Sequence, residues 1–255
     1  VAGNSIFERD YVLLDGAMGT MLQKKGMEVG TVPETLNILK PEWIVDIHKS
    51  YIEAGADIVY ANTFGANRYK MENTGYSVKE LISAAIKNAK EAAKGTLVAL
   101  DLGPIGQLLE PTGSLTFEEA YDIFKEEVVA AEGADVIVIE TMTDLLETKA
   151  AVLAAKENSN LPVMTTMTFE ENKRTFTGCS VSAMCLTLQG LGVDALGVNC
   201  SLGPKDLLPI VEEISKWTYL PIVVKANAGL PDPVTNTYNV SADEFATICK
   251  EMLKF

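Results

Sequence analysis

The sequence predicts an α/β protein in which strands and helices alternate around a (β/α)8 barrel. Short runs of Val, Ile, Leu and Ala recur along the 255 residues, and each is followed by a turn and then a helical pattern. Most of these runs are apolar throughout, which is typical of parallel strands covered on both faces. We therefore expect one parallel sheet beneath a layer of helices.

A local repeat gives a further observation. Residues 54–57 (AGAD), 132–135 (EGAD) and 191–194 (LGVD) each stand between a predicted helix and a predicted strand. The glycine suits the left-handed turn that ends many helices, and the strand follows at once. The repeat precedes the second, fourth and sixth strands, so we interpret the chain as a succession of strand–helix modules.

Seven strands and seven helices are expected. The strands are residues 12–14, 58–61, 97–100, 136–139, 163–167, 195–198 and 222–224. The helices are residues 41–54, 77–94, 116–131, 145–157, 180–190, 205–216 and 241–253. Capping signals support several of the helix starts: Pro41 stands first in its helix, and residues 116–119 and 241–244 match the capping box.

Strict alternation leaves two architectures, the barrel and an open, doubly wound sheet. No Gly-x-Gly-x-x-Gly follows the first strand, which disfavours the dinucleotide-binding form of the open sheet. We therefore predict a single TIM-barrel domain over residues 1–255. An eighth strand and helix are not found before Phe255, so the barrel is expected to be truncated before strand 8, with open edges on strands one and seven.

Composition narrows the classes of function. Apolar residues make up 47% of the chain and charged residues 22%, as in an ordinary globular protein. The net charge of −14 argues against nucleic acid or an anionic membrane as a partner. No apolar run approaches the ~20 residues of a membrane span, and residues 1–11 do not resemble a signal peptide. Four cysteines in so long a chain are expected to be reduced, which predicts a cytoplasmic protein.

The ends of the predicted strands carry the candidate chemistry, because in a barrel they converge on one mouth. Two carboxylates, one thiol and several glycines would suit an amino-acid ligand. Backbone N–H groups of residues 16–20 could hold a carboxylate, and Asp15 or Glu140 could hold an ammonium. The strand-end residues are 15–20, 62–65, 101–104, 140–141, 168, 199–200 and 225–229.

Each candidate also has a structural interpretation. Asp15 could cap the turn after the first strand. Cys200 alone is a weak signal, because a free cysteine is commonly a small core residue. Glu140 follows four apolar residues, and a buried carboxylate needs a partner. We therefore interpret Glu140 as functional.

The other thiols and the single histidine are assigned to structure. Cys185 and Cys249 lie on apolar faces of predicted helices, and Cys179 follows Gly178 in a loop, where we expect it to fill space. His48 lies inside a predicted helix, far from any strand end, so we interpret it as a packing or surface residue.

Lys225 supports an alternative function. A lysine at the end of the seventh strand could form a Schiff base in a barrel lyase, although no obvious proton shuttle stands near it in the sequence. A third hypothesis is a non-catalytic barrel that binds a ligand and lacks a metal site.

The assembled motifs resemble one known family. They are residues 14–20 (LDGAMGT), 61–65 (ANTFG), 103–104 (GP), 139–141 (IET), 197–204 (GVNCSLGP) and 226–231 (ANAGLP). In this order they are similar to the homocysteine S-methyltransferase family, and most similar to the homocysteine-binding barrel of its cobalamin-dependent members.

The resemblance implies methyl transfer to the zinc-activated thiol of homocysteine, giving methionine. It implies zinc held by three cysteines, of which Cys200 is one and the catalytic residue. The two further cysteine ligands, in a Gly-Gly-Cys-Cys-Gly motif, are expected beyond residue 255, so these 255 residues alone are expected to bind zinc weakly or not at all. Three ligands leave tetrahedral zinc an open position, where a bound thiol loses its proton.

The resemblance also implies roles for the remaining site residues. Asp15 and Glu140 would hold the ammonium of the substrate, and Asn199 and Asn227 would support the mouth. The backbone that would hold the substrate carboxylate belongs to Gly16, Ala17, Gly19 and Thr20. The implied methyl donor is methylcobalamin, or another donor, supplied by another domain or protein. Corrinoid-binding and folate-binding domains are the implied partners.

Overall fold

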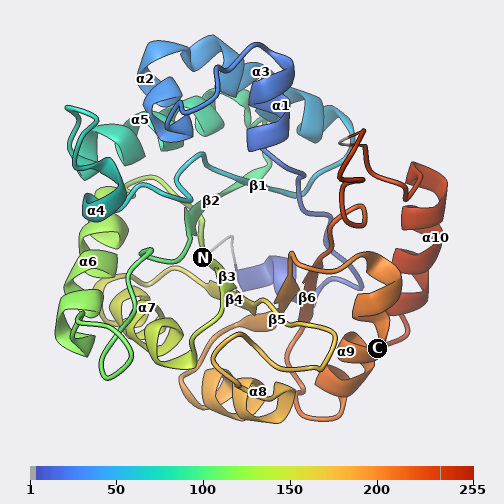
Figure 1. Cartoon of the computed structure of the whole chain (residues 1–255). Coiled ribbons are helices and arrows are strands. Elements are labelled where there is room, and N and C mark those ends of the chain that lie inside the picture. Colours follow the sequence, from blue (N-terminus) through green and yellow to red (C-terminus); the bar gives the residue numbers. More distant parts are fainter. Residues whose placement is uncertain (1–3, 236) are drawn as a thin grey trace.

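A parallel sheet curls inside a ring of helices (Figure 1). A computed structural model describes residues 4–235 and 237–255 of the chain. The strands pair in sequence order, each parallel to the next. They are β1 (Ile58–Tyr60), β2 (Leu97–Leu102), β3 (Val136–Met142), β4 (Val163–Met167), β5 (Ala195–Asn199) and β6 (Ile222–Lys225).

The long helices follow the predicted positions within a few residues. They are α3 (Pro41–Glu53), α5 (Val78–Ala92), α6 (Phe117–Ala130), α7 (Leu145–Asn158), α8 (Val181–Gly190), α9 (Pro204–Ser215) and α10 (Ala242–Met252). Ser77 and Thr116 close capping boxes with Glu80 and Glu119, so the side chains that start α5 and α6 satisfy the first free N–H groups.

Short helical turns fill the connections, and the sequence pattern did not predict them. They are η1 (Asn4–Glu8), α1 (Gly19–Lys24), η2 (Pro33–Thr35), α2 (Leu36–Leu39) and α4 (Arg68–Met71). Segments of three to six residues are too short to show the 3.6-residue apolar period on which helix prediction depends. No helix in the described ranges is long and apolar enough to cross a membrane.

The first predicted strand is reduced to a single paired residue. Leu14 bridges Ile58 in parallel, and the N–H of Asp15 donates to the carbonyl of Ile58 at 3.1 Å. One residue earlier the N–H of Leu13 donates to the side chain of Asp57 at 2.8 Å. Regular pairing does not extend beyond this bridge. With this segment, seven parallel segments line the sheet, as predicted.

The repeated Gly-x-Asp units join neighbouring strands at their amino ends. In each unit the Asp N–H donates to a carbonyl on the preceding strand, and the carboxylate accepts the N–H of that same residue. The glycines have φ between 79° and 103°, a left-handed backbone that favours glycine. The pairs are Asp57 with Leu13, Asp135 with Val98 and Asp194 with Val163, each with an N–H to carboxylate distance of 2.8 Å. We call these contacts the aspartate clamps.

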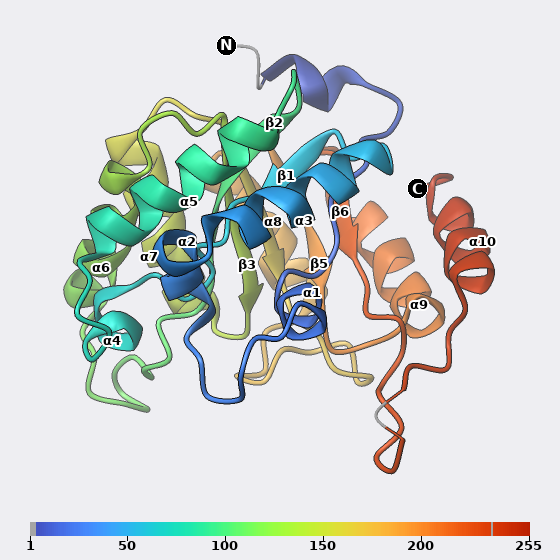
Figure 2. The same cartoon turned by 90° about the horizontal axis from the view of Figure 1, so that it is seen from above.

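Two apolar layers bury the sheet. One lies between strands and helices and includes Phe124, Leu100 and Ile210. The other fills the inside of the barrel, with Ile58, Ala99, Val138, Met164, Ala195 and Val223. At the amino ends of the strands η1 covers this inner layer, where Ile6 is 3% exposed. Figure 2 shows η1 at one end of the barrel and the long loops after the strands at the other.

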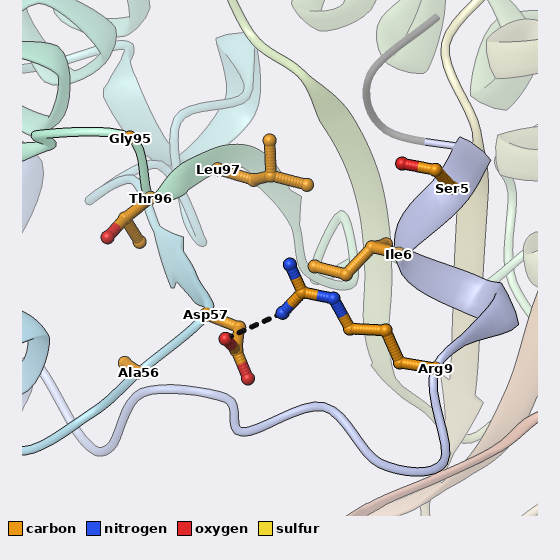
Figure 3. A pocket seen from close by; sticks show the side chains of 8 residues that line it. All are labelled: Ser5, Ile6, Arg9, Ala56, Asp57, Gly95, Thr96 and Leu97. Carbon is orange, nitrogen blue, oxygen red and sulfur yellow. Dashed lines mark hydrogen bonds and ion pairs between the residues drawn. The ribbon is translucent and has the colours of Figure 1, made fainter.

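A surface hollow lies at this amino end (Figure 3). It has a volume of about 260 Å³ and is lined by residues that include Ile6, Thr96 and Leu97. Arg9 and Asp57 form an ion pair across it at 2.9 Å, with the guanidinium side chain 56% exposed. The hollow therefore joins η1 to the first aspartate clamp, at the end of the barrel opposite the predicted chemistry.

Candidate active site

A polar layer covers the carboxyl end of the inner apolar layer. Side chains alternate across a strand, so the residue two positions beyond an inward apolar residue also points inward. At these positions the sequence changes from apolar to polar, except on β5, where Gly197 intervenes and the polar residue is Asn199, four positions beyond Ala195. The polar layer consists of Tyr60, Asp101, Glu140, Thr166, Asn199 and Lys225.

Asn199 links four neighbours in this layer. Its Oδ1 accepts the backbone N–H of Thr141 at 2.9 Å and the hydroxyl of Thr166 at 2.8 Å. Its Nδ2 lies 2.8 Å from Thr141 Oγ1, 3.2 Å from Glu140 Oε2 and 3.4 Å from Cys200 Sγ. Asn199 as a whole residue is 1% exposed, so these contacts fix the position of its side chain. Asn199 thus holds a carboxylate and a thiol side by side.

The backbone is strained at both strand ends that Asn199 joins. Thr141 has φ of 61° and Cys200 has φ of 58°, which L-residues other than glycine rarely adopt. The register between β3 and β4 shifts between Ile139 and Met142, so Glu140 and Thr141 lie in a bulge. Bulges and left-handed residues that re-aim side chains concentrate at functional sites.

Cys200 carries the thiol of the site. Its backbone N–H donates to the carbonyl of Lys225 at 3.0 Å, which ties the loop after β5 to β6. Its Sγ lies 3.8 Å from Thr141 Oγ1. Burial raises the pKa of Cys200, and the Thr141 hydroxyl and the Asn199 amide only partly offset this. The side chain is therefore a neutral thiol at pH 7 unless a cation binds it.

Asp15 and Lys225 form an ion pair between the first and last parallel segments. Lys225 Nζ lies 2.9 Å from Asp15 Oδ1 and 3.6 Å from the centre of the Tyr60 ring. The second oxygen of Asp15 accepts the N–H of Tyr60 at 2.8 Å. Burial lowers the pKa of Lys225, but the charges of Asp15 and Glu140 and the hydrogen bond to Asp15 outweigh it and leave the pKa above its ordinary value. Lys225 is therefore an ammonium.

Asp101 and Glu140 share a hydrogen bond that needs a proton. Burial and then the charge of Glu140 raise the pKa of Asp101 well above its usual range. Burial also raises the pKa of Glu140, while its hydrogen bond from Asp101 lowers it. The pKa of each carboxyl group is therefore above its ordinary value, which favours one proton held between the two and one remaining negative charge in the polar layer.

The remaining predicted residues lie at the rim. Gly16 packs against the Tyr51 ring, where an added Cβ would lie 2.7 Å from a ring carbon. The carbonyl of Ala17 accepts the hydroxyl of Tyr51 at 2.6 Å, and α1 begins at Gly19. The backbone N–H of Asn227 donates to the carbonyl of Leu202, which joins the loops after β5 and β6. The structure thus brings Cys200, Glu140 and Asn199 into direct contact, while Ala17 and Thr20 are exposed.

The other cysteines lie apart from the polar layer. Cys185 is buried in α8, Cys249 is half-buried in α10, and Cys179 Sγ donates to the carbonyl of Ser180 in the loop before α8. His48 is fully buried in α3, and burial lowers its pKa to about 4. It is a packing residue.

The sequence reasoning placed Asp101 and Thr141 among the strand ends at the mouth without giving either a specific role, and it did not single out Tyr60 or Thr166. The change from apolar to polar two residues after an inward residue would have found Tyr60, Asp101 and Thr166. Thr141 gives no such signal, because its role follows from the bulge and from the position of Asn199.

Comparison with known proteins connects this geometry to a family. A family model described as homocysteine S-methyltransferase matches residues 12–254. The methionine synthase of Mycobacterium leprae (strain TN) is 32% identical over 244 residues, and that of Mycobacterium tuberculosis (strain ATCC 25618 / H37Rv) is 31% identical over 242 residues. Each alignment covers 85% of this chain and 20% of the relative, so the chain spans about a fifth of their length.

A solved structure shares the fold. The metallated form of the homocysteine methyltransferase MmuM from Escherichia coli has a TM-score of 0.80 at 24% identity, covering 88% of this chain and 86% of that chain. The carboxyl transferase domain of Rhizobium etli pyruvate carboxylase, with oxamate and biotin, has a TM-score of 0.58 at 13% identity and covers 98% of this chain and 40% of that chain. At these identities both matches speak for the barrel architecture.

Proposed function

Because the chain belongs to the homocysteine S-methyltransferase family, as its motifs predicted, we propose that its polar layer binds homocysteine and presents the sulfur for methylation, giving methionine. In this reaction a sulfur–carbon bond forms, the bond between the methyl group and its donor breaks, and the thiol proton is released. Residues 1–255 would act as one homocysteine-binding domain.

One observation carries the proposal. The Asn199 amide lies within hydrogen-bond distance of both Glu140 and Cys200, so it fixes an anion beside a sulfur. Glu140 would hold the ammonium of homocysteine, and the substrate sulfur would lie toward Cys200. Binding at fixed geometry lowers the barrier because reacting groups meet already oriented. The strained backbone at Thr141 and Cys200 supports this assignment.

The described residues do not by themselves fit a zinc ion. Among residues 4–235 and 237–255, no group of three His, Cys, Asp or Glu side chains could hold a metal. Cys200 supplies one thiol, whereas a catalytic zinc site needs three protein ligands. Zinc, with Cys200 and two further cysteines as ligands, therefore stays a prediction, and the proposal rests on how the amino acid is held.

The methyl donor and the partners are part of the proposal. Methionine synthase relatives about five times as long as this chain support a donor carried by another domain or protein, such as methylcobalamin on a corrinoid-binding domain, with a folate-binding domain as a further partner. The polar layer lies at the carboxyl end of the strands, where α/β barrels bind ligands, and Glu140 and Lys225 are its partly exposed members. A donor would approach from this side.

The Schiff-base alternative is not favoured. A lysine that attacks a carbonyl must be a neutral amine, and Lys225 is an ammonium paired with Asp15.

The test is to supply homocysteine and methylcobalamin and to measure methionine. We expect formation of methionine by the wild type and a loss of roughly 100-fold or more in Cys200→Ala, because the substrate sulfur loses the group beside which it is held and a small misplacement of a reacting atom can cost this much. Cys249→Ala, in α10, is the matched control and should keep the wild-type rate. Homocysteine that fails to bind the wild type, or methionine formation that survives Cys200→Ala, would contradict the proposal.

A further inference from the structure

Lys225 carries the positive charge of the polar layer. It ends β6, two residues beyond the inward Val223. Its side chain is 22% exposed, whereas the side chain of its partner Asp15 is 3% exposed. The ammonium therefore faces the accessible part of the layer, and the carboxylate lies behind it.

The ammonium has a donor to spare. A lysine side chain carries three N–H donors. Asp15 Oδ1 accepts one at 2.9 Å, and the Tyr60 ring lies against the nitrogen at 3.6 Å. Within the described part of the chain, Lys225 Nζ makes no further hydrogen bond or ion pair. A third N–H is therefore free for an acceptor from outside.

Asp15, by contrast, is already engaged through both of its oxygens. One oxygen holds Lys225, and the other accepts the N–H of Tyr60 at 2.8 Å. Each oxygen could accept a second hydrogen bond, but the Asp15 side chain is 3% exposed and its charge is already paired with Lys225, so it is poorly placed to meet an incoming ammonium. Glu140 is more accessible than Asp15 and has no ion-pair partner within 4.0 Å among the described residues.

We propose that Lys225 binds the carboxylate of the amino-acid substrate, that Asp15 is the positioning residue that holds Lys225, and that Glu140 alone receives the substrate ammonium. This assignment rests on the proposed function and revises two expectations: Asp15 no longer holds the ammonium, and the backbone of residues 16–20 no longer supplies the main carboxylate contact. A zwitterion then meets one anion and one cation held at fixed places, which makes Lys225 a specificity-determining residue.

The test uses the thioether product, so that binding does not depend on a metal. Methionine, 4-(methylthio)butanoate, which lacks the amine, and 3-(methylthio)propylamine, which lacks the carboxylate, are titrated calorimetrically. Lys225→Met should weaken binding of methionine and of the butanoate by roughly 10- to 100-fold, the range for a hydrogen bond to a charged group. It should leave the propylamine unchanged. Lys225→Arg should keep the preference for the carboxylate.

A second variant covers the case in which Lys225→Met leaves Asp15 unpaired and the protein fails to fold. Asp15→Asn combined with Lys225→Met removes both charges and keeps an acceptor for Tyr60 N–H. It should show the same loss of carboxylate preference. An equal loss for all three ligands, or unchanged methionine binding, overturns the assignment to Lys225 and leaves the proposed function standing. Methionine that fails to bind the wild type overturns the proposed function, and this inference with it.

Discussion

Carboxylates line both ends of the barrel, and their partners differ. At the amino end, each aspartate clamp is satisfied by the backbone of one neighbouring strand, as in Asp194 with Val163. At the carboxyl end, Asp101 and Glu140 share a proton, and Asp15 depends on Lys225 from the far side of the sheet. Because each clamp needs only one neighbouring strand, the same arrangement occurs three times in the chain. The polar layer forms only when all the strands are in place.

This difference separates stability from binding. A clamp stabilises the pairing of two strands and faces away from the mouth. The polar layer buries several carboxyl groups close together, and the charge of one raises the free-energy cost of ionising the next. Folding alone does not require such an arrangement. Changes at the amino end should therefore alter the free energy of unfolding, and changes in the polar layer should alter ligand binding.

The largest expected effect is on the free energy of unfolding, and it depends on pH. Glu147, in the first turn of α7, accepts the N–H of Ile105 at 2.7 Å and so anchors the loop after β2. Burial raises its pKa to about 7. A folded pKa above the unfolded value of 4.5 means that its contribution is present below pH 4.5 and is lost as the pH rises through 7. The loss is about 3 kcal/mol.

Glu147→Gln tests this sign, because glutamine keeps the acceptor and does not titrate. The free energy of unfolding of the variant minus that of the wild type should rise by about 3 kcal/mol between pH 4.5 and pH 8, measured by urea titration. A difference that stays constant with pH would show that Glu147 is not held neutral in the folded protein.

A smaller effect is expected at the amino end. Asp194→Ala leaves the buried N–H of Val163 without its side-chain acceptor, so the free energy of unfolding should fall by about 2 kcal/mol. Methionine affinity should stay the same, because the clamp lies at the end of the strands opposite the polar layer. Asp194→Asn, which keeps an oxygen, should lose less. A clear change in methionine affinity would break the separation between the two ends.

The two ends also differ in how far the sequence predicts them. The Gly-x-Asp repeat correctly marked where a helix ends and a strand begins, because the glycine turn depends on residues next to one another in the chain. The one misjudged element there is the first strand, in which only Leu14 pairs with β1 while the N–H of Leu13 donates to the Asp57 side chain. No local pattern reveals such a contact between residues 44 positions apart.

At the carboxyl end the sequence indicates which residues face the mouth but not which of them meet. Asp15, Glu140 and Cys200 were predicted from their positions after strands. Their partners were not, because contact between Lys225 and Asp15 spans 210 positions and depends on the curvature of the whole sheet. The left-handed backbone of Thr141 is the extreme case, since threonine at that position favours a regular strand.

The smallest expected effect on stability tests that strained position. Thr141 has φ of 61°, a conformation that costs a β-branched residue about 1–3 kcal/mol and glycine almost nothing. Thr141→Gly removes the strain and also removes the hydroxyl that lies 2.8 Å from Asn199 Nδ2, which contributes about 1 kcal/mol. Glycine also costs about 0.5–1 kcal/mol through its greater backbone freedom in the unfolded chain, so the opposing terms nearly cancel and the free energy of unfolding should change by about 1 kcal/mol or less.

Thr141→Val separates the two terms, because valine keeps the strain and loses the hydroxyl. It should be less stable than Thr141→Gly, the reverse of the order in an ordinary strand, where glycine is the weaker residue. Both variants should bind methionine more weakly than the wild type, because Asn199 loses a partner that orients it toward Glu140 and Cys200. Unfolding by urea and calorimetric titration measure the two quantities. If the valine variant were the more stable one, the backbone of Thr141 would not be strained. The carboxyl end of the barrel would then differ from the amino end only in its buried charges.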